Sequence, residues 1–248
     1  VPTVYATLAQ IPVDADICTL RMPIAGAAPL PASVREDFAA HTGRSLLEGY
    51  GLTEATCATT WTRPGEERPG SVGRVLPGQQ IKAVTAGADG SWTDCGPGQT
   101  GVLVIGGPAV FAGYVTDPAA GGPRVSRDGI VRDGWLDTGD LGQVDDGGFV
   151  YLTGRAKDLI IRGGHNIDPR VIEDALLAHP QVAAAVAVGR PDPHAGEVPV
   201  AYVALAVGAT VGEDELRSWA SARVGEPAAA PKTVTVLDTL PATVIGKP

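Results

Sequence analysis

The sequence predicts a mixed α/β and α+β protein built from two successive units. Its 248 residues are 44% apolar and 19% charged, which is enough apolar material for sizeable cores and excludes a disordered or disulfide-stapled chain. Residues 1–155 are rich in glycine and proline and hold many short β-type runs, whereas residues 156–248 alternate strands and helices. We therefore expect a sheet-and-helix layer with a small β-barrel-like antiparallel sheet, followed by a compact α+β domain.

In the first unit, a helix is expected over residues 33–42. Ser33 and Glu36 have the spacing of a capping box, Phe38 belongs to the apolar face, and Gly43 can end the helix. Apolar runs separated by glycine-bearing turns indicate strands after this helix. The expected strands cover residues 80–84, 100–105 and 148–152, with a turn at Asp89-Gly90.

In the second unit, Asp168 and Pro169 predict the start of a helix, with Asp168 as the N-cap and proline in the first turn. Its apolar face is expected to carry Val171, Ile172, Ala175 and Leu176. The order of elements, β-α-β-β-α-β, is typical of a compact α+β domain. Strands are expected over residues 159–161, 182–188, 198–206 and 233–237, and a second helix over 213–223.

Charge and cysteine content exclude several classes of function. The net charge of −9 argues against a nucleic-acid partner, because proteins that neutralise phosphates usually carry a basic stripe. Three cysteines, odd in number and without metal-ligand spacing, predict reduced thiols and a cytoplasmic location. Since no apolar stretch reaches the roughly 20 residues of a membrane span, no transmembrane segment is expected.

Two segments of the first unit combine small residues with groups suited to a nucleotide. Gly26-Ala27-Ala28 allows a ligand to approach the backbone, although a plain turn explains it equally well. In Glu48-Gly49-Tyr50-Gly51-Leu52-Thr53-Glu54, the glycines leave the tyrosine ring exposed for stacking on a purine. Thr53 offers a hydroxyl group, and Glu54 a carboxylate able to hold Mg²⁺ beside phosphates. Taken alone, a turn with a surface tyrosine fits this segment as well.

Two single residues gain meaning only from their neighbours. Asp140 ends the segment 135–140, where a carboxylate beside glycine at a strand end can accept both hydroxyl groups of a ribose. A capped turn is an equally good explanation of that segment. Lys247 follows a glycine after the last expected strand, and in isolation it is an ordinary exposed lysine.

The expected boundary between the units holds another set of candidates. Arg155 and Lys157 lie where hinges and ligand clefts are common. Gly163 and Gly164 could line a narrow channel that any Cβ atom would block. His165 alone indicates a polar loop residue, because no second histidine stands at metal-ligand spacing.

Taken in order, these segments resemble the adenylate-forming (AMP-binding) superfamily, which includes acyl-CoA synthetases, adenylation domains of peptide synthetases, and luciferases. The resemblance runs from about residue 20 to the end of the chain. Four motifs in the superfamily's order carry it. They are residues 48–54, residues 135–140, residues 154–158 with 161–167, and residues 241–247.

Within the superfamily, the acyl-CoA synthetase branch is the closer match. Residues 162–169 are similar to its Gly-Gly-x-Asn-Ile-x-Pro pattern, and Tyr50-Gly-Leu-Thr53 stands where peptide synthetases have Tyr-Gly-Pro-Thr. The resemblance implies a two-step ligase. A carboxylic acid and ATP give an acyl-adenylate, and CoA then displaces AMP to form the thioester.

For the nucleotide, the resemblance implies a site for ATP or AMP with Mg²⁺. Tyr50 would stack on adenine, Asp140 would hold the ribose hydroxyl groups, and Thr53 and Glu54 would act on the phosphates, with Glu54 as the Mg²⁺ ligand. The implied nucleotide-binding set is Gly26, Ala27, Ala28, Glu48, Gly49, Tyr50, Gly51, Leu52, Thr53, Asp140 and Arg155.

For the second step, the resemblance implies a mobile C-terminal domain, residues 156–248, that rotates about a hinge at Lys157 and closes as a lid. Lys247 would be the catalytic cation that bridges carboxylate and phosphate and stabilises charge in a site of low dielectric constant. The implied CoA-binding set is Gly163, Gly164, His165 and Asn166.

Two departures from the superfamily pattern set the limits of this interpretation. No serine-, threonine- and glycine-rich phosphate loop precedes residue 20, and the chain stops one residue after Lys247. We therefore expect the later part of a longer enzyme, inactive without its N-terminal part. A domain that loads a carrier protein, or a non-catalytic fragment that binds nucleotide or CoA, remain alternatives. The acyl substrate and the oligomeric state stay open.

Overall fold

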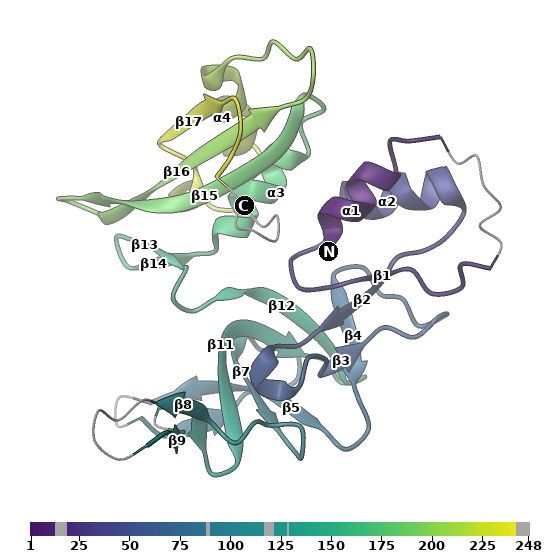
Figure 1. Cartoon of the computed structure of the whole chain (residues 1–248). Coiled ribbons are helices and arrows are strands. Elements are labelled where there is room, and N and C mark those ends of the chain that lie inside the picture. The colour runs from purple at the N-terminus through teal and green to yellow at the C-terminus, as the bar shows by residue number, and fades with distance from the viewer. Residues whose placement is uncertain (13–18, 88–89, 117–121, 128, 242–248) are drawn as a thin grey trace. The chain divides into compact units, whose positions relative to one another are not determined.

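The structure is a computed structural model that describes residues 1–12, 19–87, 90–116, 122–127 and 129–241 (Figure 1). It divides into two compact units, Val1–Thr153 and Gly154–Pro248. Within the described ranges, no helix is both long and apolar enough to cross a membrane.

The described residues of the first unit form two helices, a 3₁₀ turn and twelve strands. The helical elements are α1 (Pro2–Leu8), α2 (Ala32–Thr42) and η1 (Thr53–Ala55). The strands are β1 (Ile24–Ala25), β2 (Leu47–Tyr50), β3 (Thr60–Trp61), β4 (Ser71–Val75), β5 (Gln80–Ala86), β6 (Trp92–Asp94), β7 (Gly101–Gly106), β8 (Tyr114–Thr116), β9 (Arg124–Ser126), β10 (Val131–Arg132), β11 (Trp135–Val144) and β12 (Phe149–Arg155).

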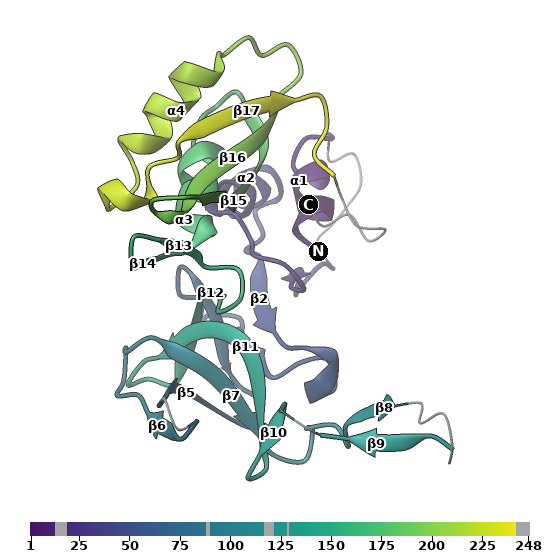
Figure 2. The same cartoon turned by 90° about the vertical axis from the view of Figure 1, so that its left-hand side faces the viewer.

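Most of these strands join in one sheet with the order β1-β2-β3-β4-β12-β11-β7-β5-β6, and β10 pairs with β11. The strands expected over 80–84, 100–105 and 148–152 are confirmed as β5, β7 and β12. They are antiparallel members of a larger sheet, in which β1 and β2 are a parallel pair. Strands β8 and β9 form a separate hairpin that extends from this unit (Figure 2). Asp89 of the expected turn lies outside the described residues.

Helix α2 confirms the expected helix but corrects its start. Pro31 is the N-cap, no side chain caps the helix, and Ser33 already lies in the first turn, so the predicted capping box is wrong. Pro31 has φ −59° and ψ 141°, which leads the chain directly into the helix before Ser33. Gly43 ends the helix in the left-handed conformation, with φ 67°, as expected.

The buried apolar residues described in the first unit form two clusters. One lies between the helices and β1, where Phe38 packs against Ala25, Leu30 and Leu46, and the ring of Tyr5 meets the Phe38 ring edge-on at 5.1 Å. The other fills the antiparallel part of the sheet. Its buried members are Tyr50, Ala55, Val72, Ala83, Leu103, Ile105, Leu136 and Val150.

Up to residue 241, the second unit is a five-stranded sheet with two helices on one face. Its strands run in the order β14-β13-β16-β15, with β17 parallel to β16. Helix α3 packs on β15, α4 packs on β17, and the helices touch each other. The bounds are β13 (Ile160–Arg162), β14 (His165–Ile167), α3 (Pro169–Leu177), β15 (Val182–Asp192), β16 (Gly196–Leu205), α4 (Glu213–Ser221), η2 (Pro227–Ala229) and β17 (Thr233–Leu237).

All elements expected in this unit are present, and β14 is an additional strand. The side chain of Asp168 accepts a hydrogen bond from the Arg170 backbone N–H, which confirms the predicted N-cap. Ile172 and Leu176 are buried in a single core, but Val171 is 42% exposed. The apolar face of α3 is therefore narrower than predicted, because Val171 points about 100° away from Ile172 on the helix.

Candidate functional site

The carboxyl ends of the parallel strands β1 and β2 bring two predicted segments together. A Cβ atom on Gly26 would lie 3.1 Å from the carbonyl oxygen of Gly49, so the two backbones nearly touch. Ala27 follows with φ 69°, a left-handed conformation that is costly for a residue with a side chain. In open α/β sheets, ligands bind beyond the carboxyl ends of parallel strands. This edge is therefore the place to expect a ligand.

The chain turns sharply just beyond β2. A Cβ atom on Gly51 would lie 2.0 Å from the carbonyl oxygen of Cys57, a distance that no side chain tolerates. Gly51 is thus required by the close approach of two backbone segments. The turn carries Thr53, which is exposed, and Glu54, which is half-buried, in η1.

Tyr50 and Asp140, 90 residues apart, are joined by a hydrogen bond. The Tyr50 hydroxyl group donates to Oδ2 of Asp140 over 2.7 Å. Both residues are buried, with exposed fractions of 8% and 6%. The second and third predicted segments therefore belong to one site.

The structure corrects the predicted exposure of the Tyr50 ring. The ring is buried because it belongs to the apolar cluster between the sheet strands, and its polar end reaches Asp140. Buried tyrosines usually give their hydroxyl group a partner in this way. The glycines at 49 and 51 serve close backbone packing instead of exposing the ring.

Asp140 lies within β11 and not at a strand end as predicted. The pairing of β11 with β7 shifts register between Asp137 and Leu141, which face Val104 and Val102. Residues 138–140 thus stand opposite the single residue Leu103. Thr138 Oγ1 donates to the Leu103 carbonyl oxygen at 2.7 Å and accepts from the Asp140 backbone N–H at 3.0 Å, which holds this bulge.

Glu54 has a partner from the segment after β7. Its Oε1 accepts a hydrogen bond from the Tyr114 hydroxyl group at 2.5 Å, and its backbone oxygen accepts from the Phe111 N–H at 2.8 Å. The hydrogen bond to Glu54 raises the pKa of Tyr114, which favours the protonated, donating phenol. The predicted Mg²⁺ ligand is therefore held by contacts on its side chain and its backbone.

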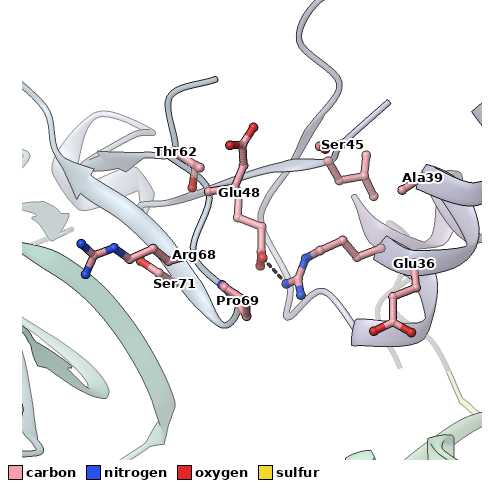
Figure 3. Close-up of a pocket in the computed structure, with 11 residues that line it drawn as sticks. Glu36, Ala39, Ser45, Glu48, Thr62, Arg68, Pro69 and Ser71 are labelled. Atoms are coloured by element: carbon pink, nitrogen blue, oxygen red, sulfur yellow. Dashed lines mark hydrogen bonds and ion pairs between the residues drawn. The ribbon is translucent and has the colours of Figure 1, made fainter. Parts of the chain in front are cut away.

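The side chain of Glu48 forms an ion pair with Arg35 on α2, drawn as a dashed line in Figure 3. Burial raises the pKa of Glu48, and the nearby guanidinium group opposes that rise. The pair lines a cavity of about 290 Å³, together with Thr62 and Arg68. Glu48 is the single member of the predicted nucleotide-binding set in the lining of this cavity.

In the second unit, the predicted CoA-binding residues occupy one hairpin. Arg162 pairs with His165 across Gly163 and Gly164, whose φ values are 58° and 87°. A two-residue turn with both φ angles positive favours glycine, so the turn itself accounts for both glycines. A Cβ atom on either would meet nothing within 4 Å in the described chain.

The remaining candidates before residue 242 are exposed. His165 and Asn166 lie on β14, and Nδ1 of His165 is 3.4 Å from a carboxylate oxygen of Glu226. Arg155, at the end of β12, and Lys157, in the turn after it, are exposed as well. Lys247 lies outside the described residues.

Two residues that the sequence patterns did not single out contact the site. Tyr114 binds the carboxylate of Glu54 from 60 positions away, and Arg35 binds Glu48 from the neighbouring helix. No local pattern predicts either contact, because each depends on how distant segments pack. The Gly-Tyr pair at 113–114 is the one sequence feature that could have drawn attention to this tyrosine.

Two family models match the chain. Residues 1–115 match the model described as AMP-binding enzyme, and residues 171–247 match the AMP-binding enzyme C-terminal domain. The chain belongs to the AMP-binding enzyme family. It is similar to a marinolic acid–CoA ligase of Pseudoalteromonas sp. strain SANK 73390, with 45% identity over 100% of this chain and 37% of that protein.

Other members of the AMP-binding family are likewise similar over nearly all of this chain but over less than half of their own length. A long-chain-fatty-acid–CoA ligase of Bacillus subtilis is 36% identical over 99% of this chain and 43% of its own length. The crystal structure of ATP-bound MatB from Rhodopseudomonas palustris has a TM-score of 0.87 and 34% identity, over 99% of this chain and 48% of that one. The chain thus spans less than half the length of these relatives.

Proposed function

We propose that the protein to which this chain belongs is an AMP-forming acyl-CoA synthetase. The observation that carries the proposal is the hydrogen bond between Tyr50 and Asp140, because it joins two separate family motifs at the carboxyl ends of β1 and β2. The names of the relatives, CoA ligases at 36–45% identity, support the reaction type.

In this proposal, the first unit binds the nucleotide. Tyr50 lies beside the adenine and holds Asp140, whose carboxylate accepts the ribose hydroxyl groups. Gly26, Ala27 and Ala28 give the backbone of this edge close access to the ligand. Glu48, Gly49, Gly51 and Leu52 complete the predicted set by shaping the strand end and turn that carry Tyr50 and Thr53.

The first unit also has the donor that Mg²⁺ requires. Mg²⁺ usually binds proteins through one or two carboxylates and completes its shell with water and substrate phosphates. Glu54 supplies one carboxylate, and the described ranges hold no group of three or more acidic, histidine or cysteine side chains that could hold a metal ion by themselves. When bound, the ion neutralises charge on the phosphates, while Thr53 contacts phosphate.

The reaction has two steps. In the first, a carboxylate oxygen of the acid bonds to the α-phosphorus of ATP, and the bond from that phosphorus to the bridging oxygen breaks, so that pyrophosphate leaves. Arg155 helps to fix the nucleotide, and the ammonium group of Lys247 stabilises the charge that builds up. In the second step, the thiol of CoA loses its proton and its sulfur bonds to the acyl carbon, while the bond from that carbon to the phosphate oxygen breaks and AMP leaves.

The second unit is proposed to act as the mobile lid of this enzyme. Lys157 would be its hinge, and Gly163, Gly164, His165 and Asn166 would meet CoA after the rotation. The exposure of residues 163–166 suits this role, because these four residues lie outside the unit's own core. The partners are then a small carboxylic acid, ATP, CoA and the N-terminal part of the same protein. The free thiols of Cys57 and Cys95 support a cytoplasmic location.

The test uses the whole protein with ATP, Mg²⁺, CoA and a panel of carboxylic acids of different length. We expect acid-dependent release of AMP and pyrophosphate and formation of an acyl-CoA. Release of ADP, or no nucleotide cleavage with any acid, would contradict the proposal. Replacing CoA by a carrier-protein thiol decides between the two acceptors, since a carrier-loading domain would leave free CoA unused.

Lys247→Ala separates the two steps. We expect adenylation, measured as acid-dependent ATP–pyrophosphate exchange, to fall by about 10²–10³-fold, because a charge stabiliser of the transition state is lost. Conversion of a supplied acyl-adenylate and CoA to the thioester should stay within a few-fold. Lys232→Ala, a change at another lysine of the second unit, is the matched control. Equal loss of both steps would contradict the role assigned to Lys247.

A further inference from the structure

The turn that carries Glu54 is fastened to residues 109–114 at three points. The Phe111 N–H donates to the Glu54 carbonyl oxygen at 2.8 Å, and Thr56 Oγ1 donates to the Ala109 carbonyl oxygen at 2.7 Å. The third point is the hydrogen bond from the Tyr114 hydroxyl group to Oε1 of Glu54. One short segment thus holds both the backbone and the carboxylate of the turn.

The turn needs this support. Thr56 and Cys57 follow Glu54 with φ values of 56° and 79°. The left-handed region costs a non-glycine residue about 1–2 kcal/mol, and a β-branched residue such as threonine rarely enters it. Such a backbone persists where its surroundings fix it, and strained positions concentrate at functional sites. The contacts from residues 109–114 add to the hydrogen bonds that the turn makes with Leu52 and Thr53, and one of them holds the Glu54 side chain.

The two oxygens of the Glu54 carboxylate differ in their surroundings. Oε1 accepts from Tyr114, whereas no donor from the described part of the chain reaches Oε2. Tyr114 is itself oriented by Phe111, whose ring meets the tyrosine ring edge-on at 5.0 Å. It is 48% exposed, so burial alone does not fix this tyrosine.

We propose that Tyr114 is a positioning residue for Glu54, holding Oε1 so that Oε2 is the oxygen presented to the Mg²⁺ that accompanies the nucleotide phosphates. The inference rests on the proposed function, which assigns Glu54 as the Mg²⁺ ligand. Tyr114 touches neither reactant in this arrangement. It acts by restricting the carboxylate to one orientation before the ion binds, which lowers the cost of ordering on binding.

The experiment compares Tyr114→Phe with Tyr151→Phe in the whole protein. Tyr151, on β12, also donates to a carboxylate, Oδ2 of Asp145 at 3.4 Å, and neither residue belongs to the proposed site. For the first readout, the affinity for ATP is measured by calorimetry at a series of Mg²⁺ concentrations, with no carboxylic acid substrate present. The value compared between variants is the Mg²⁺ concentration at which the gain in ATP affinity is half complete. The second readout is the Mg²⁺ dependence of ATP–pyrophosphate exchange.

We expect Tyr114→Phe to raise the half-saturating Mg²⁺ concentration about tenfold in both readouts, equivalent to about 1.4 kcal/mol. Tyr151→Phe should leave it unchanged. In a Glu54→Gln background, Tyr114→Phe should add less than about twofold, because the residue acts through that carboxylate. Thermal unfolding of each variant verifies that the comparison concerns folded protein.

The outcomes separate this inference from the proposed function. If the protein forms AMP and acyl-CoA but Tyr114→Phe behaves like Tyr151→Phe, the positioning role of Tyr114 is overturned alone. An effect of Tyr114→Phe that persists undiminished in Glu54→Gln also overturns it. If Mg²⁺ leaves ATP affinity unchanged in the unsubstituted protein, the assignment of Glu54 fails and the inference with it, whatever the AMP-forming assay shows.

Discussion

In the first unit, the predicted site residues come from segments far apart in the sequence, whereas the described site residues of the second unit follow one another along a single stretch. Tyr50 meets Asp140 across 90 positions, and Glu54 meets Tyr114 across 60. By contrast, Gly163, Gly164, His165 and Asn166 share one exposed hairpin, and Arg155 and Lys157 lie on the chain just before it.

In the first unit, the same residues contribute to the proposed site and to the stability of the fold. In the second unit, different residues serve these two roles. Tyr50 is a member of both the apolar cluster and the proposed site, so a change there affects folding and ligand binding together. Residues 163–166 of this hairpin lie outside the core of the second unit, which includes Ile160 and Ile167 of the same hairpin and residues of α3 and α4. A change at residues 163–166 is therefore expected to alter function at a smaller cost in stability.

The largest expected contrast is between two glycine-to-alanine substitutions, one in each unit. Gly51→Ala places a Cβ atom 2.0 Å from the Cys57 carbonyl oxygen, and the backbone shift that this forces should cost about 3 kcal/mol or more. Gly164→Ala meets open space and pays only for its φ of 87°, about 1–2 kcal/mol. Denaturant unfolding of both variants measures the difference. A Gly164→Ala cost equal to that of Gly51→Ala would break the comparison.

A second expected effect concerns the hydrogen bond between Tyr50 and Asp140. Tyr50→Phe leaves a buried carboxylate short of one donor, and losing a hydrogen bond to a charged group should cost about 1.5–3 kcal/mol. Hydrogen exchange should show the loss in β2 and β11 and not in β15 and β16. Tyr202→Phe on β16 is the control in the second unit, where we expect little change. Unaltered exchange in β2 would show that the bond contributes nothing to the fold.

The smallest expected effect is a pH-dependent gain in the free energy of unfolding of the second unit, caused by a substitution of Glu173. Burial raises the pKa of Glu173, and Asp168 and Asp174 add to the rise, while a hydrogen bond from the Ala187 N–H opposes it. Because the pKa of Glu173 is higher in the folded protein than its ordinary value of 4.5, the ionised carboxylate destabilises the folded state at high pH. Well below pH 4.5 the carboxyl group is protonated in both states, and this destabilisation is absent.

Glu173→Gln keeps an acceptor for the Ala187 N–H and removes the charge. We therefore expect it to raise the free energy of unfolding at pH 7, with the gain shrinking as the pH falls and vanishing below about pH 4. Urea unfolding at several pH values measures this trend. A gain that stays constant across the range would contradict the role of the charge.

The sequence predicted the structure correctly where that structure depends on residues that are neighbours in the chain. The N-cap at Asp168, the glycine that ends α2 and the strand Thr233–Leu237 follow from local patterns, and all three are confirmed. Prediction from the sequence failed where the packing of distant segments determines the structure. The burial of the Tyr50 ring, the bulge that holds Asp140 and the Tyr114 contact each depend on segments that meet only in the folded sheet.

The bulge in β11 also limits which insertions and deletions the chain tolerates. Residues 138–140 stand opposite one residue of β7, so the strand carries two extra residues, and alternation between the faces of the sheet resumes with unchanged parity at Leu141. Deleting one residue would turn the rest of β11 inside out. Deleting two of these three residues would leave a regular strand without the bulge that Thr138 holds beside Asp140. Sequence drift in this strand can thus proceed by substitution, but its length is fixed.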